Sequence, residues 1–335
     1  MQKLFNNVFV TGGGGYCASL LIPRLLSRDY KVTAFDTFMF GDYLPQDANL
    51  KRIKGDIRDV AQLRQVTPGH DAFVSLGCIS NDASFELDEN LSTSINLDAF
   101  EPMVQAAKNA GVKRFVYASS SSVYGVSDQP DVTEDHPLVP VSLYNKYKGM
   151  CEPILKKHAD DNFTGVIFRP ATVCGYAPRL RLDLSVNILT NHAVTNNKIT
   201  VFGGSQLRPN LYVQDYCDAV ELLLIAPTEK IQKEIFNVGF QNMSIMEIAK
   251  MVKKVVAEEY PDKPEIEIVT TESNDGRSYH INSDKVARVL GFKPKYTIED
   301  AVRSLCTAFK AGKIPDSMTD DRYYNIRTMK NLDIK

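Results

Sequence analysis

Short apolar runs alternate with helical patterns along the first half of the chain. Runs rich in β-branched and aromatic residues predict strands at 8–10, 32–35, 52–55, 72–76, 115–118 and 165–168. Apolar residues recur at helical spacing over 18–26, 99–109 and 144–158. Strands that alternate with helices are joined by right-handed crossovers and form a parallel sheet. The pattern therefore predicts an α/β fold built around a doubly wound parallel sheet.

The pattern changes after Arg169 and Pro170. Prolines and a glycine pair divide the following chain into shorter pieces. The clearest elements there are a helix at 245–258, a strand at 266–269 and a helix at 298–309. We expect three regions: a sheet-forming domain at 1–175, a smaller, interleaved C-terminal α/β domain mainly at 176–311, and a polar tail at 312–335. Later segments are expected to return to the first domain.

Composition narrows the class of protein. The 335 residues are 44% apolar and 24% charged, which is ordinary for a soluble globular protein. A net charge of −2 gives no reason to expect binding to nucleic acid or to an anionic membrane, and no apolar run is long enough to span a bilayer. The six cysteines are scattered without a C-x-x-C spacing, so we expect neither a metal site nor a disulfide framework. These features together predict a cytoplasmic protein.

A glycine turn follows the first predicted strand. Gly12, Gly15 and Ala18 fit the spacing G-x-x-G-x-x-[GA] between that strand and the first helix. Such a turn lets backbone N–H groups approach a pyrophosphate at the helix N-terminus. Asp36 ends the second strand, where a carboxylate accepts hydrogen bonds from both ribose hydroxyls and repels a 2′-phosphate. The first domain is therefore predicted to be a Rossmann-type domain that binds NAD in preference to NADP.

Tyr144 and Lys148 stand one helical turn apart on the helix predicted at 144–158. A pair at this spacing is commonly a solvated surface pair, so the spacing alone indicates little. Combined with the glycine turn and the serine run at 119–122, it predicts a hydride-transfer site. A tyrosine is a poor base at neutral pH until a nearby ammonium stabilises its phenolate, and a serine hydroxyl can orient the same substrate oxygen. Tyr147 has no lysine at the matching spacing.

These residues and motifs together resemble the extended short-chain dehydrogenase/reductase family. The likeness is closest to nucleotide-sugar epimerases and dehydratases such as UDP-galactose 4-epimerase, and it covers roughly residues 5 to 310. It implies an NAD-dependent enzyme that acts on a nucleotide-diphosphate sugar by hydride transfer at C4. It also implies that Tyr144, Lys148 and Ser120 are the catalytic residues, since Ser120 precedes Tyr124 at the family's spacing.

The resemblance also implies binding residues. For the cofactor they are Gly12, Gly15, Tyr16, Cys17, Asp36, Asp56, Ile57, Leu76, Gly77, Asn96, Lys148 and Arg169. For the substrate they are Ser80, Ser121, Thr172, Arg179, Asn187, Arg208 and Arg277. Thr172 departs from the family, which often has asparagine at this position. Arg179 and Arg181 could bind the substrate diphosphate or belong to a solvated loop.

The fate of the 4-keto intermediate separates the subfamilies. By resemblance, a 4,6-dehydratase has an Asp-Glu pair where this chain has Ser121 and Ser122, and a 3,5-epimerase has a cysteine in place of Ser122. A 4-epimerase and a 4-dehydrogenase or 4-ketoreductase are left, and we favour the epimerase. A non-catalytic, NAD-binding regulatory protein is a further alternative, which the presence of Ser120, Tyr144 and Lys148 opposes. The helical faces at 99–109 and 143–155 would suit a four-helix interface, so a homodimer is expected.

Overall fold

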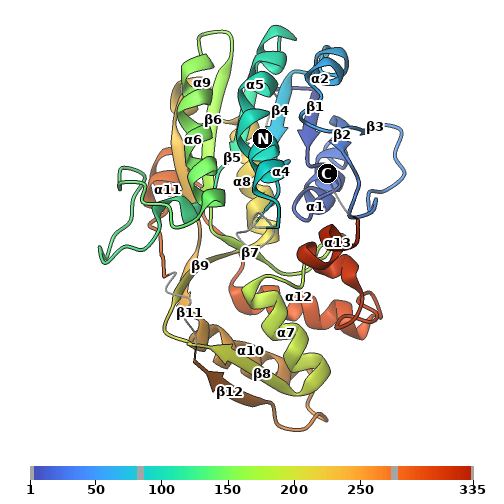
Figure 1. Ribbon diagram of the computed structural model, residues 1–335, viewed down its shortest axis with the longest axis vertical. Coiled ribbons are helices and arrows are strands. Elements are labelled where there is room, and N and C mark those ends of the chain that lie inside the picture. Colours follow the sequence, from blue (N-terminus) through green and yellow to red (C-terminus); the bar gives the residue numbers. More distant parts are fainter. Residues whose placement is uncertain (1–3, 81–86, 273–277, 333–335) are drawn as a thin grey trace.

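The computed structural model describes residues 4–80, 87–272 and 278–332. Its centre is a sheet of seven described strands, all parallel, in the order β10-β6-β5-β4-β1-β2-β3 (Figure 1). The strands are β1 (Asn7–Thr11), β2 (Lys31–Asp36), β3 (Leu50–Lys54), β4 (Ala72–Ser75), β5 (Arg114–Ala118), β6 (Thr164–Pro170) and β10 (Ile235–Val238). The strand order runs outward in opposite directions from β1 and β4. The sheet is therefore doubly wound, which confirms the predicted fold class.

Helices cover both faces of this sheet. One face packs against α1 (Ala18–Leu26) and α8 (Val213–Ile225), and the other against α2 (Val60–Val66), α5 (Phe100–Asn109) and α6 (Leu143–His158). Alternate residues of β1 point to opposite faces, so Val8 and Val10 join the first core and Phe9 joins the second. Because both faces are buried, the central strands β1 and β4 are largely apolar, and for this reason the sequence pattern located them, whereas the edge strand β3 is partly exposed and carries three basic residues.

A smaller unit lies below the sheet in Figure 1. Its elements are β7 (Thr172–Cys174), α7 (Ser185–Asn196), β8 (Lys198–Phe202), β9 (Leu207–Tyr212), β11 (Gln241–Ser244), α10 (Ile245–Glu259), β12 (Glu267–Thr271) and α12 (Ile298–Lys310). Strands β11, β9 and β7 form one small sheet, and β12 and β8 form another. Helices α7, α10 and α12 pack on one another around a separate apolar core. The three elements expected in this region are α10, β12 and α12.

Part of the C-terminal half returns to the large sheet. After β9 the chain forms α8, then α9 (Thr228–Ile231) and then β10, which pairs with β6. Helix α11 (Asp284–Leu290) packs beside β10. Residues 213–238 thus lie with the first domain, although they fall inside the range 176–311. The two units are interleaved, and both reach the edge at which the parallel strands end.

The C-terminal tail packs across the junction of the two units, where it is dark red in Figure 1. Ile314 and Tyr323 are buried in the core of the smaller unit, whereas Met329 packs on Ile79 and Leu91 of the sheet domain. The tail contains η3 (Asp321–Tyr323) and α13 (Asn325–Asn331), and the other short elements are α4 (Glu89–Thr93), η1 (Ser94–Asp98) and η2 (Ser121–Tyr124). The tail therefore connects the two units.

Three further features bear on function. No helix in the described ranges has the length and apolar character needed to cross a membrane. All six cysteines are unpaired. The described residues contain no group of three or more His, Cys, Asp or Glu side chains arranged to hold a metal ion.

Candidate active site

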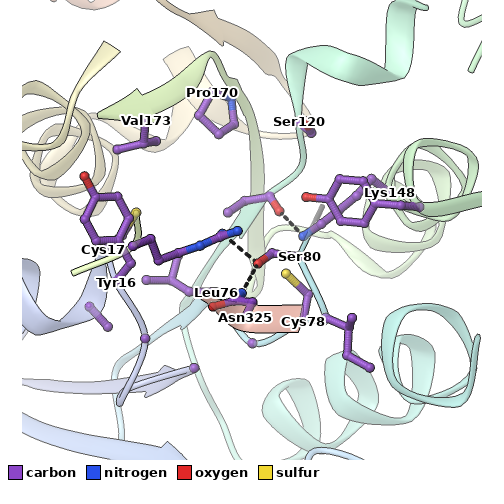
Figure 2. Close-up of a pocket in the computed structure, with 18 of the residues that line it drawn as sticks. Tyr16, Cys17, Leu76, Cys78, Ser80, Ser120, Lys148, Pro170, Val173 and Asn325 are labelled. Atoms are coloured by element: carbon purple, nitrogen blue, oxygen red, sulfur yellow. Dashed lines mark hydrogen bonds between the residues drawn. The ribbon is translucent and has the colours of Figure 1, made fainter. Parts of the chain in front are cut away.

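A cavity of about 910 Å³ opens at the carboxyl edge of the large sheet. Six strand ends reach its wall, through Gly12, Asp36, Lys54, Leu76, Ala118 and Pro170. In Figure 2, Tyr16 and Cys17 lie on one side of the cavity and Lys148 on the other, with Ser80 and Asn325 between them. Ligands of doubly wound sheets bind beyond the carboxyl ends of the strands, next to the point where the strand order reverses. The cavity occupies this position.

The glycine turn forms the wall at the end of β1. Gly12 has a φ of +70°, and a Cβ atom there would lie 2.7 Å from the backbone nitrogen of Gly77. The N–H of Gly15 donates to the carbonyl oxygen of Gly12 at 3.0 Å, and the chain then enters α1. Ala18 is buried where this helix packs on the sheet. Position 12 thus requires glycine, and the first turn of α1 meets the cavity, as a dinucleotide pyrophosphate requires.

Asp36 closes β2 at the same wall. Its carboxylate accepts the N–H of Gly14 at 3.1 Å and the N–H of Phe38 at 2.6 Å. Burial raises the pKa of Asp36 above its ordinary value, while the two backbone hydrogen bonds act in the opposite direction. The carboxylate is thus fixed at the end of the strand beside the glycine turn, where it fits a cofactor ribose. The preference for NAD over NADP stays a prediction.

The predicted catalytic residues meet on one wall of the cavity. Ser120 follows β5, whereas Tyr144 and Lys148 lie on the first two turns of α6, and all three line the cavity. The side chain of Ser142 caps α6 by accepting the N–H of Asn145 at 3.2 Å. Lys148 is buried, and its Nζ donates to the carbonyl oxygen of Ala118 at 2.8 Å. This bond attaches the helix to the strand end that carries Ser120.

The alternative tyrosine and the neighbouring serines have other surroundings. Tyr147 does not line the cavity, and its hydroxyl accepts a hydrogen bond from Thr93 Oγ1 at 3.4 Å. Ser119 donates to Glu152 Oε1 at 2.6 Å. Ser122 shares a 2.7 Å hydrogen bond with Ser120 and also bonds to Asn145. Of the two tyrosines, only Tyr144 is thus placed to reach a ligand in the cavity.

Four further predicted cofactor residues also line the cavity. Asp56 and Ile57 follow β3, and Leu76 and Gly77 follow β4. Asp56 forms an ion pair with Arg58 at 2.7 Å. Burial alone would raise the pKa of Asp56, but the hydrogen bonds from Arg58 outweigh it and hold the pKa below its ordinary value. Asp56 therefore stays ionised at the rim of the cavity.

Three predicted binding residues lie behind the wall instead. Asn96 bonds to the backbone N–H and carbonyl of Ile79 at 2.9 and 2.8 Å. Arg169 forms a buried ion pair with Glu152 at 2.6 Å. Asn187 accepts the N–H of Gly175 at 2.8 Å and is fully buried. These side chains are occupied by protein partners and do not line the cavity.

The predicted substrate residues are divided in the same way. Ser80, Ser121, Thr172, Arg179 and Arg208 line the cavity. Arg208, on β9, lies 5.3 Å from the ring centroid of Tyr279, which also lines the cavity. Arg277 lies outside the described residues. Arg208 and Thr172 thus line the part of the cavity at which the substrate is predicted to bind.

The structure adds residues that the sequence did not single out. Asp183 forms an ion pair with Arg181 at 2.9 Å and accepts the backbone N–H of Asn325 at 3.0 Å. Burial would raise the pKa of Asp183, but the charge of Arg181 outweighs it and lowers the pKa. Asn325 comes from the tail and lines the cavity beside Ser80. No local motif marks either residue, because the contact between Asp183 and Asn325 joins positions 142 residues apart.

Fold and site together define a class of protein. A glycine turn before α1, an acidic residue ending β2 and a Ser-Tyr-Lys group beside the same cavity are the parts of a dinucleotide-dependent oxidoreductase of the short-chain dehydrogenase/reductase type.

Comparison with known proteins gives the family. Residues 8–239 match the model of the NAD dependent epimerase/dehydratase family. A UDP-glucose 4-epimerase of Lactobacillus helveticus is 28% identical over 90% of this chain and 96% of its own length. A dTDP-D-glucose 4,6-dehydratase of Mus musculus is 28% identical over 88% of this chain and 86% of its own. The crystal structure of UDP-glucose 4-epimerase with UDP-glucose from Thermotoga maritima, at 22% identity, superposes with a TM-score of 0.81 over 91% of this chain and 99% of that chain.

The chain belongs to the NAD-dependent epimerase/dehydratase family. It is an enzyme of the extended short-chain dehydrogenase/reductase type, and its cofactor is NAD. The family consists of nucleotide-sugar epimerases and dehydratases. The expected family, enzyme class and cofactor are therefore confirmed. The roles of individual residues stay proposals.

Proposed function

We propose that the protein is a nucleotide-sugar 4-epimerase, which oxidises C4 of a bound sugar and then reduces the same carbon from the opposite face. One observation carries this proposal. Ser120, Tyr144 and Lys148 share a cavity wall, but the carboxylates among the described lining residues are only Asp36, Asp56 and Asp183. The first two lie at the nucleoside end, and the third is paired with Arg181. The wall supports proton transfer at one hydroxyl without a carboxylic acid for elimination.

The protein's own residues would move the proton at that hydroxyl. Tyr144 accepts the proton from the C4 hydroxyl and later returns it. The buried ammonium of Lys148, one turn along α6, stabilises the phenolate and contacts the cofactor ribose. Ser120 Oγ orients the same substrate oxygen. When bound, NAD supplies the acceptance and return of hydride.

The residues at positions where related enzymes have other catalytic groups also favour a 4-epimerase. A 4,6-dehydratase would need an acid and a base to eliminate water, but Ser121 and Ser122 occupy the corresponding positions. Glu152 is the acidic residue of α6, and it is held by Arg169 and Ser119 in a buried cluster behind the wall. These observations disfavour elimination. A 4-dehydrogenase would use the same catalytic residues, so only the identity of the product distinguishes it from an epimerase.

The substrate is proposed to be a nucleotide-diphosphate sugar. Arg208 supports this, because a guanidinium that lines the cavity at the substrate end can make paired hydrogen bonds to phosphate oxygens. The curated relatives named UDP-glucose 4-epimerase and dTDP-D-glucose 4,6-dehydratase support a sugar activated in this way. Arg277 is proposed as the second phosphate ligand on the family resemblance alone.

The test of this proposal is a substrate screen followed by product analysis. Thermal shift in the presence of NAD identifies which UDP-, GDP-, CDP- or dTDP-sugar stabilises the protein, because a ligand that binds the native state raises the melting temperature. Proton NMR of the reaction then identifies the product. An epimerase gives the C4 epimer without net NADH. A 6-deoxy-4-keto sugar would instead establish a dehydratase, and a 4-keto sugar with equimolar NADH a dehydrogenase.

Assembly and location are proposals of the same kind. The outer surface of α6 exposes Met150 and Pro153, which would suit packing of α5 and α6 against a second copy of the chain as a homodimer. Sedimentation velocity would distinguish a dimer from a monomer. Six unpaired cysteines suit a reducing compartment, so a cytoplasmic location is proposed.

A further inference from the structure

Two buried guanidinium groups stand in the wall of the cavity with unused hydrogen-bond donors. Arg179 is 2% exposed and Arg181 is 7% exposed, and both line the cavity. Arg179 Nε and Arg181 Nη2 are buried and have no hydrogen-bond partner among the described residues. Unsatisfied buried donors are costly and uncommon, most of all on charged groups. A ligand that accepts hydrogen bonds would remove this cost.

The carboxylates that face the pair are already engaged by other groups. Arg181 is paired with Asp183 at 2.9 Å, whereas the side chain of Arg179 donates to the neutral amide of Asn325 at 2.6 Å. Asp36 is the next carboxylate in range, and its oxygens already accept backbone N–H groups. Burial and the positive charge of Arg181 lower the pKa of Arg179 to about 10. An anion in the cavity would therefore stabilise both cations.

The surroundings of the pair point to the cofactor rather than to the sugar nucleotide. The backbone N–H of Arg179 donates to Ser19 Oγ at 3.1 Å, in the first turn of α1 behind the glycine turn. The guanidinium of Arg179 lies 4.2 Å from the ring centroid of Phe40, soon after β2. Arg181 donates to Ser80, which follows β4, at 2.9 Å. Strands β1, β2 and β4 and the N-terminus of α1 are the elements that receive a dinucleotide in this fold.

We propose that Arg179 and Arg181, together with the glycine turn, hold the diphosphate of the NAD cofactor. The C-terminal tail completes this site, because Asn325 holds the guanidinium of Arg179 and also donates to Ser80 at 3.3 Å. Figure 2 shows Ser80 and Asn325 together at the centre of the cavity. The proposal reassigns Arg179, which the family resemblance placed at the substrate. It does not depend on which reaction the enzyme catalyses.

The test uses ligands derived from the cofactor, on the full-length chain. Binding of ADP-ribose, which carries the diphosphate, is measured by calorimetry, and binding of adenosine, which lacks it, by saturation-transfer NMR. Arg179→Gln and Arg181→Gln should each weaken ADP-ribose binding roughly tenfold or more, because each removes charge-assisted hydrogen bonds. Adenosine binding should change less than about twofold. Arg327→Gln, an exposed arginine of α13, is the control with the same loss of charge.

The contribution of the tail is tested by a double-mutant cycle. Asn325→Ala should weaken ADP-ribose binding in the wild-type background but not in the Arg179→Gln background, because the asparagine acts through the arginine. Asn331→Ala, on the exposed surface of the same helix, is the matched control and should have no effect. Additive losses in the double variant would contradict the positioning role of Asn325.

Two results would overturn the proposal for the arginines. Weaker UDP binding with unchanged ADP-ribose binding would assign them to the substrate. Equal loss of ADP-ribose and adenosine binding would make them structural. Thermal unfolding without ligand separates folding effects. Arg179→Gln removes no ion pair and should not lower the melting temperature, whereas Arg181→Gln leaves Asp183 without its partner and should lower it. Should a glutamine variant not fold, the corresponding lysine variant is measured instead. A loss confined to ADP-ribose then supports the proposal, and unchanged affinity contradicts it.

Discussion

Lys148 Nζ donates a 2.8 Å hydrogen bond to the carbonyl oxygen of Ala118, and this bond holds α6 against the end of β5. Tyr144 on α6 and Ser120 after β5 therefore reach the same wall of the cavity. The ammonium also lies 5.2 Å from the ring centroid of Tyr117, which shields one side of it. One buried cation thus connects the two elements that carry the proposed catalytic residues.

The two roles proposed for this lysine predict a double effect. Lys148→Met keeps the length of the side chain but removes its charge, so turnover should fall and NAD binding should weaken by roughly tenfold. Calorimetry with NAD and steady-state assays on the identified sugar nucleotide measure the two effects. Lys146→Met, at an exposed position of α6, is the control. Unchanged NAD affinity in Lys148→Met would show that Lys148 does not contribute to cofactor binding.

Tyr144→Phe should have a single effect. The variant loses the ionisable hydroxyl and keeps the ring, so turnover should fall by roughly two to four powers of ten while NAD affinity and melting temperature stay close to wild type. Tyr147→Phe is the matched control one position from Lys148, and its turnover should fall little, since its hydroxyl bonds to Thr93 outside the cavity. If turnover falls strongly in Tyr147→Phe and only slightly in Tyr144→Phe, Tyr147 is the base.

Burial of Asp36 predicts how the stability of the ligand-free protein depends on pH. Folding raises the pKa of this buried carboxylate, so its destabilising effect is fully present above the folded pKa and vanishes as pH falls below the unfolded pKa. Asp36→Asn carries no charge, but its single amide oxygen can accept only one of the two N–H groups, from Gly14 and Phe38, that the carboxylate accepts. The contribution of position 36 to the pH dependence of the melting temperature should therefore be absent in the ligand-free variant.

The same substitution should reduce the preference for NAD over NADP, because the repulsion of a 2′-phosphate is lost. Calorimetry with both dinucleotides measures this preference in wild type and variant. A wild-type protein that binds NADP more tightly than NAD would contradict the role given to Asp36.

Arg208 predicts an effect confined to the substrate. Arg208→Gln should raise the dissociation constant of the identified sugar nucleotide roughly tenfold or more, because paired hydrogen bonds to phosphate are lost, and should leave NAD binding near normal. Arg303→Gln, on the outer surface of α12, controls for the change in net charge. Equal weakening of sugar-nucleotide binding and NAD binding would show that the contact of Arg208 with Tyr279 maintains the cavity as a whole.

The parts of the site that could be predicted from the sequence are local. The glycine turn is defined by three positions beside one strand, and Tyr144 and Lys148 by one helical turn, so the combination of these short motifs located them. The doubly wound sheet was equally predictable, because strands buried on both faces are continuous apolar runs. Helices α7 and α8 were not predicted, since both are buried on several sides and lack a clear apolar stripe.

The remaining site residues depend on contacts that spacing does not encode. Arg169 was expected at the cofactor, but consecutive residues of a strand point to opposite faces, and its side chain turns to Glu152 while Pro170 lines the cavity. The side chain of Asn187 accepts a hydrogen bond from the backbone N–H of Gly175 and does not reach the cavity. Asn325 reaches Arg179 across 146 positions of chain. Such pairs depend on how the two units and the tail pack.

A 4-epimerase requires that hydride leaves C4 and returns to the same carbon before the product departs. The most direct test uses the identified sugar nucleotide labelled with deuterium at C4, with catalytic enzyme and NMR detection. An epimerase should yield a C4 epimer that keeps its deuterium, with no free NADH accumulating. A 4-keto product with the deuterium recovered in released NADH would contradict the epimerase and establish a dehydrogenase.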